Sequence, residues 1–338
     1  MARGIELIRL LADGDYHSGE AIAQRLGISR SAVWKALRKD ADQFELALER
    51  TPGRGYRLAG PLELLDAGRI VSDLTVAGQA RLARLEVHDQ IDSTNGRLMA
   101  EAATGAPSGS VCLAERQTAG RGRRGRTWVS PFAANVYLSV LWRHPLGPAA
   151  LGGVSLAAGV TGAAILHRLG LGEVGLKWPN DLLWRGRKLG GLLLEVAGEA
   201  QGPSHLVVGL GVNLRMDAGQ GRAIDQPWVD LHQALDGQPP GRNRLAAALI
   251  DGLLEMLDRF GRVGGAGGLA PCLADWERFD LLRGQRIRVQ LGERLFEGDY
   301  AGIDPAGALR LDTPDGLMHL HSGEVTVRVA QTEDGSVS

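Results

Sequence analysis

The sequence has little cysteine, little lysine and no long apolar run. Its two cysteines, Cys112 and Cys272, match neither a disulfide framework nor the spacing of a metal site, which suits a reducing cytoplasm. No apolar run reaches about 18 residues, so no membrane span is expected. The N-terminal residues carry acids and lack a small-residue cleavage site, which excludes a secretory signal. These absences indicate a cytoplasmic location.

The charged residues are nearly balanced, with 38 Lys and Arg against 39 Asp and Glu and a formal net charge of -1. This balance excludes a uniformly basic nucleic-acid binder, so any DNA-binding surface must be local. The chain is 338 residues long and 44% hydrophobic, which favours a soluble protein of two or three domains. Only four basic residues are lysine, at positions 35, 39, 177 and 188. A compact ammonium and a planar guanidinium are not interchangeable, so these positions are candidates for special chemistry.

The first domain, residues 1–62, is predicted to be a winged helix-turn-helix. The apolar residues at its start are spaced as on one face of a helix. Ser18 is placed as the N-cap of a second helix over 19–26. Ser29 is placed as the N-cap of a third helix, over about 30–39. The tight turn between these two helices is the pattern of a helix-turn-helix.

The remainder of this domain predicts a hairpin, because apolar residues alternate over 44–48 and again over 56–58. Five basic residues and no acid lie between residues 21 and 39, which favours contact with DNA phosphates. An ordinary solvated basic face is the alternative. The candidate DNA-binding residues are Ser29, Arg30, Ser31, Lys35, Arg38, Lys39 and Arg54.

The second domain, residues 63–282, begins with a linker that merges into a helix near residue 80. Strands and helices then neither alternate regularly nor form separate blocks, which predicts an α+β domain with a mixed sheet. Strands are expected over 111–115, 135–142, 174–178, 192–196 and 205–211, and helices over 151–169 and 245–260.

A glycine-rich segment, Gly120–Gly125, formally matches the G-x-G-x-x-G dinucleotide fingerprint. A strand rather than a helix is expected after it, and no acid lies about twenty residues further on, so the match is rejected. Four arginines occupy the six positions 121–126, and their repulsion predicts a loop that stays mobile until it binds an anion. A solvated loop and a second DNA-binding stretch are the alternatives.

A second unusual string, Lys177–Asp181, places a lysine, an amide and a carboxylate at the end of a strand. A purely structural ion pair is the alternative. Lys188 follows and leads into two glycines, which permit close approach of a ligand. The chain has no P-loop, no HExxH motif, no His/Cys cluster and no nucleophile motif, so we expect no resident metal site.

Four strings in this order resemble biotin–protein ligases: Asp92–Asn95, Gln117–Arg126, Lys177–Asp181 and Lys188–Gly191. Together with the N-terminal domain, they resemble the bifunctional bacterial type, a biotin ligase that is also the biotin operon repressor. The resemblance covers about residues 5 to 328. Small departures are Gly190, where alanine is common, and Thr127, where a basic residue can occur. Lipoate ligases share the fold, but their glycine-rich signature is absent.

The resemblance implies a two-step reaction, that of a biotin–[acetyl-CoA-carboxylase] ligase. Biotin and MgATP give biotinyl-5′-AMP and pyrophosphate, and a lysine of the biotin carboxyl carrier protein then takes the biotin. It also implies a homodimer that forms with biotinyl-AMP and binds the operator DNA of biotin biosynthesis genes. Two alternatives remain: a ligase whose winged helix is only structural, and a biotin-sensing regulator without catalysis.

The resemblance also assigns roles, which agree with the chemistry of the side chains. Arg121, Arg123 and Lys188 would neutralise the biotin carboxylate and the α-phosphate, and Asp181 completes the catalytic set. The ureido ring of biotin needs polar partners in an otherwise apolar pocket, and Ser93, Thr94 and Gln117 suit this role. The expected ligand-binding residues are Ser93, Thr94, Asn95, Gln117, Arg121, Gly122, Arg123, Trp128, Lys177, Asn180, Lys188, Gly191, Asn213 and Trp228.

The third domain, residues 283–330, has the short strands and turns of a small SH3-like β-barrel. Strands are expected over 286–289, 294–303, 308–312 and 317–329, with turns that include Ser322-Gly323, and the residues after Val329 are expected to be disordered.

Overall fold

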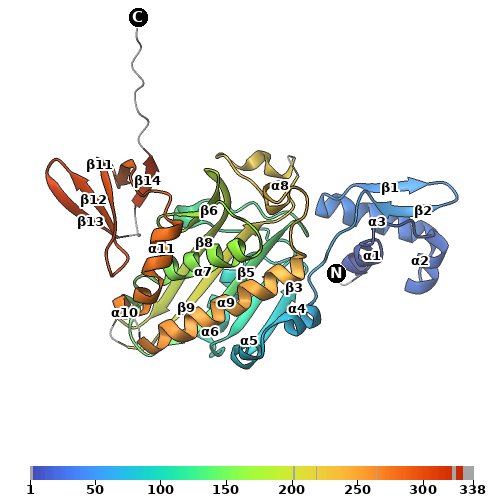
Figure 1. The fold of residues 1–338 in the computed structure, drawn as a ribbon. Coiled ribbons are helices and arrows are strands. Elements are labelled where there is room, and N and C mark those ends of the chain that lie inside the picture. Colours follow the sequence, from blue (N-terminus) through green and yellow to red (C-terminus); the bar gives the residue numbers. More distant parts are fainter. Residues whose placement is uncertain (1–2, 201, 218, 264, 322–324, 330–338) are drawn as a thin grey trace, which may run out of the picture.

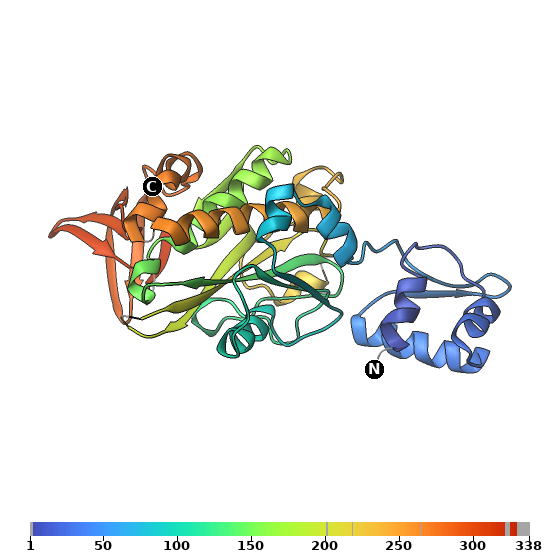
Figure 2. The same ribbon diagram turned by 90° about the horizontal axis from the view of Figure 1, so that it is seen from below.

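The computed structural model describes residues 3–200, 202–217, 219–263, 265–321 and 325–329. Three parts lie in a row in Figures 1 and 2. A helical module with the N-terminus lies at one end, a large sheet covered by helices lies in the middle, and a smaller sheet lies at the other end. The class predicted from the sequence, α+β with these three parts, is confirmed.

The N-terminal module contains α1 (Arg3–Leu10), α2 (Gly19–Leu26), α3 (Arg30–Phe44), β1 (Leu48–Thr51) and β2 (Gly55–Leu58). The Ser18 hydroxyl accepts hydrogen bonds from two N–H groups at the start of α2, and the Ser29 hydroxyl accepts one from Ala32. Both predicted caps are therefore confirmed. Gly27 closes α2 with φ +63°, which glycine adopts without steric cost.

The third helix is longer than predicted, and the strand expected over 44–48 begins only at Leu48. Val33, Leu37, Ala41 and Phe44 are all buried on one side of α3. This helical spacing continues to Phe44, so packing extends the helix by a further turn.

The linker runs into two short helices, α4 (Ala67–Asp73) and α5 (Val76–Arg81), which pack on the long helix α9 (Arg242–Val263). The other helices are α6 (Thr94–Ala103), α7 (Val154–Arg168), α8 (Leu231–Ala234), α10 (Gly265–Leu269) and α11 (Leu273–Phe279). Short 3₁₀ turns occupy Arg123–Gly125, Pro148–Leu151, Gln220–Ala223 and Ala270–Cys272.

The central sheet has seven strands in the order β3-β4-β5-β9-β8-β7-β6. Its only parallel pair is β3 with β4, and every other neighbour is antiparallel. Their bounds are β3 (Arg84–His88), β4 (Ser110–Ala114), β5 (Asn135–His144), β6 (Val174–Lys177), β7 (Asp181–Trp184), β8 (Arg187–Gly198) and β9 (Ser204–Asn213). The five predicted strands are confirmed with shifted ends, whereas the short strands β3 and β7 were not foreseen.

Helices cover both faces of this sheet. Val111 and Leu113 of β4 belong to the core shared with α7 and α9, whereas Cys112 between them packs with Leu98 of α6. Side chains that alternate along a strand point to opposite faces, so α6 lies on the face away from α7 and α9.

One stretch of the described chain, Pro148–Arg168, is long and apolar enough by length and composition to cross a membrane. From the sequence no membrane span was expected, because glycines and a serine in this stretch interrupt the run of apolar residues. The stretch is apolar because α7 packs in the protein core, where its buried residues include Leu156, Ala157, Val160, Ile165 and Leu166.

The C-terminal sheet is antiparallel, in the order β13-β12-β11-β10-β14. Its strands are β10 (Arg286–Leu291), β11 (Arg294–Ile303), β12 (Leu309–Thr313), β13 (Gly316–Leu320) and β14 (Val325–Val329). The short strands predicted over 317–329 are confirmed as β13, which pairs with β12, and β14, which pairs with β10 on the other side of the sheet. The predicted turn at Ser322-Gly323 and the tail after Val329 lie outside the described residues.

Candidate active site

A cavity of about 540 Å³ lies over β8 and β9 and beneath the arginine-rich loop. Every residue that the sequence proposed for ligand binding or catalysis lines it, although these residues come from strings spread over more than a hundred positions. The structure therefore brings the whole predicted set together. The role of each residue stays a prediction.

One end of the cavity is polar and buried. Ser93 caps α6, and its hydroxyl accepts a hydrogen bond from the Gly96 N–H at 3.3 Å. Gln117 Oε1 accepts hydrogen bonds from the Thr94 N–H at 2.9 Å and the Thr94 hydroxyl at 3.1 Å. Asn95 is 4% exposed and donates to Glu195 Oε2 at 2.8 Å. These side chains are fixed before any ligand arrives, so this end can recognise a small neutral polar group.

Two features of this end were missed in the sequence. Ser139, in the middle of β5, is fully buried, and its hydroxyl lies 2.8 Å from Thr94 Oγ1 and 2.6 Å from Asn95 Oδ1. Gly211 of β9 has no room for a side chain, because an added Cβ would lie 2.5 Å from the Trp128 ring. Alternating glycines at 209 and 211 were the available signal, because they leave one face of a strand bare.

The other end of the cavity is cationic. Lys188 Nζ lies 2.8 Å from Asp181 Oδ1 and 5.7 Å from the centre of the Trp128 ring. Arg123 donates to Asn180 Oδ1 at 3.3 Å. Arg121 lies nearer the polar end, because it forms an ion pair at 3.1 Å with Glu195, the carboxylate to which Asn95 donates.

Burial lowers the pKa of Lys177 and the pKa of Arg123 below their ordinary values. Desolvation of a cation has this effect because it disfavours the charged form. Arg328 of β14, which the sequence analysis missed, also lines the cavity, and its charge contributes to the lowered pKa of Lys177. Partly desolvated cations at one end of a cavity provide a binding site for an anion.

The arginine-rich loop folds back on itself above the cavity. Gly122 N–H donates to Arg126 O at 2.7 Å and Trp128 N–H donates to Gly120 O at 2.9 Å. Arg124 is left-handed with φ +57°, which closes the turn. The predicted absence of a helix after this segment is confirmed, since β5 follows. Its predicted mobility stays a prediction.

Trp228 comes from a segment that the structure joins to Lys188. Lys188 N–H donates to Pro227 O at 2.9 Å, and Val229 N–H donates to Lys188 O at 2.9 Å. Asn213 donates to Val229 O at 3.1 Å, so Asn213 and Trp228, both predicted to bind the ligand, belong to one hydrogen-bonded unit.

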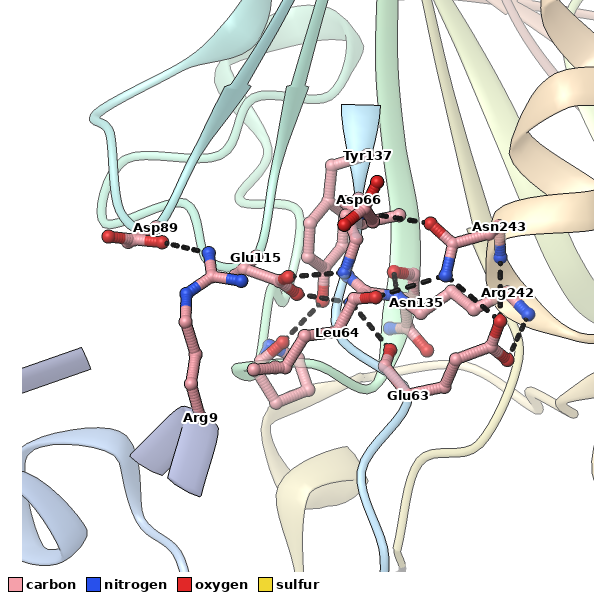
Figure 3. A network of polar contacts seen from close by, with 12 residues as sticks. Arg9, Glu63, Leu64, Asp66, Asp89, Glu115, Asn135, Tyr137, Arg242 and Asn243 are labelled. Atoms are coloured by element: carbon pink, nitrogen blue, oxygen red, sulfur yellow. Dashed lines mark hydrogen bonds and ion pairs between the residues drawn. The ribbon is translucent and has the colours of Figure 1, made fainter. Parts of the chain in front are cut away.

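The base of the site is a buried polar network, shown in Figure 3. Glu115, two positions before Gln117, is fully buried and forms an ion pair with Arg242 at the start of α9. The same carboxylate accepts a hydrogen bond from the Leu65 N–H of the linker at 2.6 Å, and Asn243 accepts one from Asp66 N–H at 2.8 Å. The network therefore fixes the linker to the strand that leads into the site.

The winged helix packs beside the two ends of the loop over 117–130. Arg116 donates to the Gln43 carbonyl and forms an ion pair with Glu45 at 3.1 Å. Phe132 is buried against Phe44, with ring centres 4.3 Å apart. Arg9 and Asp89 form a further, exposed ion pair between the two parts at 2.9 Å, also visible in Figure 3.

The residues proposed for DNA binding are all exposed on the N-terminal module. The Ser29 hydroxyl already caps α3, and it lies 3.0 Å from the Ser31 hydroxyl. Arg54, at the hairpin tip, lies over the Tyr16 ring at 4.0 Å. The basic face of α3 is thus open to solvent, as a DNA-contacting helix requires.

Three family models match separate parts of the chain. The Biotin/lipoate A/B protein ligase family matches residues 87–213, the Biotin protein ligase C terminal domain matches 283–328, and an HTH domain matches 3–57. Fold and site thus define a ligase of the biotin/lipoate class with a helix-turn-helix module.

Relatives narrow the class. The Bifunctional ligase/repressor BirA of Salmonella typhimurium is 41% identical over 327 residues, which cover 97% of this chain and 98% of that protein. The Biotin--[acetyl-CoA-carboxylase] ligase of Mycobacterium tuberculosis is 35% identical, covering 80% of this chain and 97% of that one. The biotin protein ligase of Aquifex aeolicus, solved with biotin and ATP, has a TM-score of 0.61 at 25% identity and covers 74% of this chain and all of that one. The chain belongs to the biotin protein ligase family, among its bifunctional ligase/repressor members.

Proposed function

We propose that this protein activates biotin with MgATP and transfers it to a lysine of a biotin carboxyl carrier protein. One observation carries the proposal: the predicted residues line a single cavity that has buried amide and hydroxyl groups at one end and the Lys188–Asp181 pair with neighbouring cations at the other. Biotin has a neutral ureido ring at one end and a carboxylate at the other. The relatives named ligases support the same activity.

In the first step, a carboxylate oxygen of biotin attacks the α-phosphorus, and pyrophosphate leaves as the bond between the α- and β-phosphates breaks. Both reactants are anions, so their approach is opposed by charge. Arg121, Arg123 and Lys188 act by neutralising that charge as it develops. The Thr94 hydroxyl and the Gln117 amide orient the ureido ring. This orientation places the biotin carboxylate at the cationic end of the cavity.

Magnesium enters as MgATP. The part of the chain that the structure describes contains no group of three or more His, Cys, Asp or Glu side chains that could hold a metal. Magnesium is usually bound by one or two carboxylates together with substrate phosphates, and Asp181 is the carboxylate that fits this role.

In the second step, the neutral amine of the carrier lysine attacks the acyl carbon of biotinyl-AMP. An amide bond forms, the bond to the phosphate oxygen breaks, and AMP leaves with its electron pair while the amine loses a proton. A mixed anhydride hydrolyses readily in water, so the loop over 121–128 protects it by covering the cavity.

The helix-turn-helix module adds a second activity, repression of biotin biosynthesis genes. We infer that biotinyl-AMP favours a homodimer, which presents two copies of α3 to two operator half-sites, and that the protein is cytoplasmic. Support comes from the open basic face of α3 and from relatives named ligase/repressor.

The test measures adenylate and DNA binding with one preparation. Purified protein with biotin and α-labelled ATP is expected to form biotinyl-AMP, and a gel shift on a biotin operon promoter is expected to strengthen when biotin and ATP are both present. Adenylate without any shift would indicate a ligase with a structural winged helix. A shift without adenylate would indicate a non-catalytic regulator.

A further inference from the structure

Trp178, between Lys177 and the Asn180–Asp181 pair, contacts the C-terminal module. Its side chain is 2% exposed and separates the ligand cavity from a second small cavity lined by Gly153, Pro179 and Gly307. The indole N–H donates a hydrogen bond to the Gly307 carbonyl at 3.1 Å. The contact joins two residues 129 positions apart in the chain.

The acceptor lies in a turn over 304–308, which Asp304 stabilises. Asp304 Oδ1 accepts hydrogen bonds from the Ala306 and Ala308 N–H groups, both at 2.9 Å, and Oδ2 lies 2.9 Å from His319 Nδ1. The backbone closes the turn as well, because Gly307 N–H donates to Asp304 O at 2.9 Å. The Gly307 carbonyl is therefore fixed in direction.

Gly307 itself has no tolerance for a side chain. Its φ is +87°, and an added Cβ would lie 2.9 Å from Leu156 Cδ1 and 3.3 Å from Gly153 Cα. The turn therefore packs directly on the start of α7, and glycine at 307 is what lets its carbonyl reach Trp178.

The tip of the hairpin that carries Trp178 is bonded to β8 on its β7 side, where the Asn180 side-chain amide donates to Leu192 O at 2.5 Å and the Asn180 carbonyl accepts from Leu192 N–H at 2.9 Å. Its β6 side depends on other contacts. β6 is the last strand of the sheet and pairs along its length only with β7, in a register that places Lys177 opposite Asp181. On its outer side it has a single bridge, between Leu176 and Asp280. The tip of a hairpin at a sheet edge moves more easily than its interior unless other contacts fix it.

We propose that Trp178 and the turn over 304–308 position the cationic end of the cavity, where ATP would bind. By fixing the tip of the β6–β7 hairpin, they set where Lys177, Asn180 and Asp181 stand in the cavity. The inference rests on the proposed function, because its readout is biotinyl-AMP formation.

Two substitutions test the contact from its two sides. Trp178→Phe removes the donor and keeps an aromatic ring, and Gly307→Ala displaces the acceptor without touching the ligand cavity. A hydrogen bond of this kind contributes about 1 kcal/mol, so each variant is expected to raise the KM for ATP about 5- to 10-fold. The affinity for biotin without ATP should change less than about twofold, because the ureido end lies on other elements.

Matched controls are Trp184→Phe on β7, whose ring lies under Arg185 and Arg187, and Gly284→Ala, where φ is +73° and no atom lies within 4 Å of the added Cβ. Both should keep the wild-type KM for ATP. If Gly307→Ala fails to fold, Asp304→Ala, which loosens the same turn, takes its place.

The inference is overturned if Trp178→Phe raises the KM for ATP while Gly307→Ala or its substitute does not, since Trp178 would then act by direct contact with the ligand. It is equally overturned if both variants lose biotin affinity in parallel with ATP, which indicates general damage. Failure of the wild-type protein to make biotinyl-AMP would instead refute the proposed function.

Discussion

Replacing Lys188 with alanine removes an ammonium held at a fixed place between a carboxylate and an aromatic ring. Its Nζ lies 2.8 Å from Asp181 Oδ1, and the side chain is 17% exposed. A preorganised charge donor at a developing anion contributes about 10²- to 10³-fold to the rate, or roughly 2.7 to 4 kcal/mol. Lys188→Ala should therefore slow biotinyl-AMP formation by this factor and leave biotin binding nearly unchanged.

Lys188→Arg keeps the charge and should still slow the step at least about tenfold, because a guanidinium needs more room than an ammonium. The Lys188 ammonium lies between Asp181 Oδ1, at 2.8 Å, and the Trp128 ring, whose centre is 5.7 Å away. The assay is the burst of labelled biotinyl-AMP in quenched flow at saturating biotin and ATP. An unchanged burst in the alanine variant would refute the proposed role of Lys188.

Other predictions follow from burial and charge. Arg242→Met leaves the Glu115 carboxylate buried without its cation and should destabilise the protein by about 3 to 5 kcal/mol; an unchanged Tm contradicts this. Because burial lowers the pKa of Lys177, its charge is lost at a lower pH than that of an ordinary lysine. As the pH is raised toward 10.5, the KM for ATP should therefore increase before an ordinary lysine would lose its charge. Over the same pH range the unliganded protein becomes more stable, because the cost of burying the charged Lys177 disappears when it loses its proton. In a Lys177→Gln variant the KM for ATP should depend less on pH. An unchanged pH dependence would contradict the assignment to Lys177. Lys39→Arg should leave operator affinity within about twofold. Arg30→Ala should weaken operator binding and lower the slope of log affinity against log salt concentration by about one. Equal effects of the two variants would contradict the assigned DNA-binding face.

The parts of the fold that local chemistry decides could be predicted from the sequence. Ser18 and Ser29 cap the helices for which their hydroxyls are suited, and five of the seven central strands were predicted. The end of α3 was placed too early although the apolar spacing continues to Phe44; the packing of Phe44 on Phe132 of another domain is the part that no local pattern contains.

The same division holds in the site. Motifs of contiguous residues supplied most of the predicted side chains that line the cavity, including Lys177 and Lys188, two of the four lysines. Arg328 was missed because it reaches the cavity from a strand far along the chain, and Ser139 was missed because it supports Thr94 and Asn95 from a strand and lies in no motif of its own. Only the tertiary structure shows that they belong to it.

Transfer of biotin to a carrier lysine tests the central claim most directly. The purified protein is incubated with biotin, MgATP and an isolated biotin carboxyl carrier domain, and the product is examined by mass spectrometry, with Lys188→Ala protein and a carrier lacking the acceptor lysine as controls. We expect one biotin in amide linkage on the acceptor lysine, formed only with ATP, strongly slowed by Lys188→Ala and absent from the carrier without that lysine. A carrier domain that stays unmodified while the protein binds biotin would contradict the account.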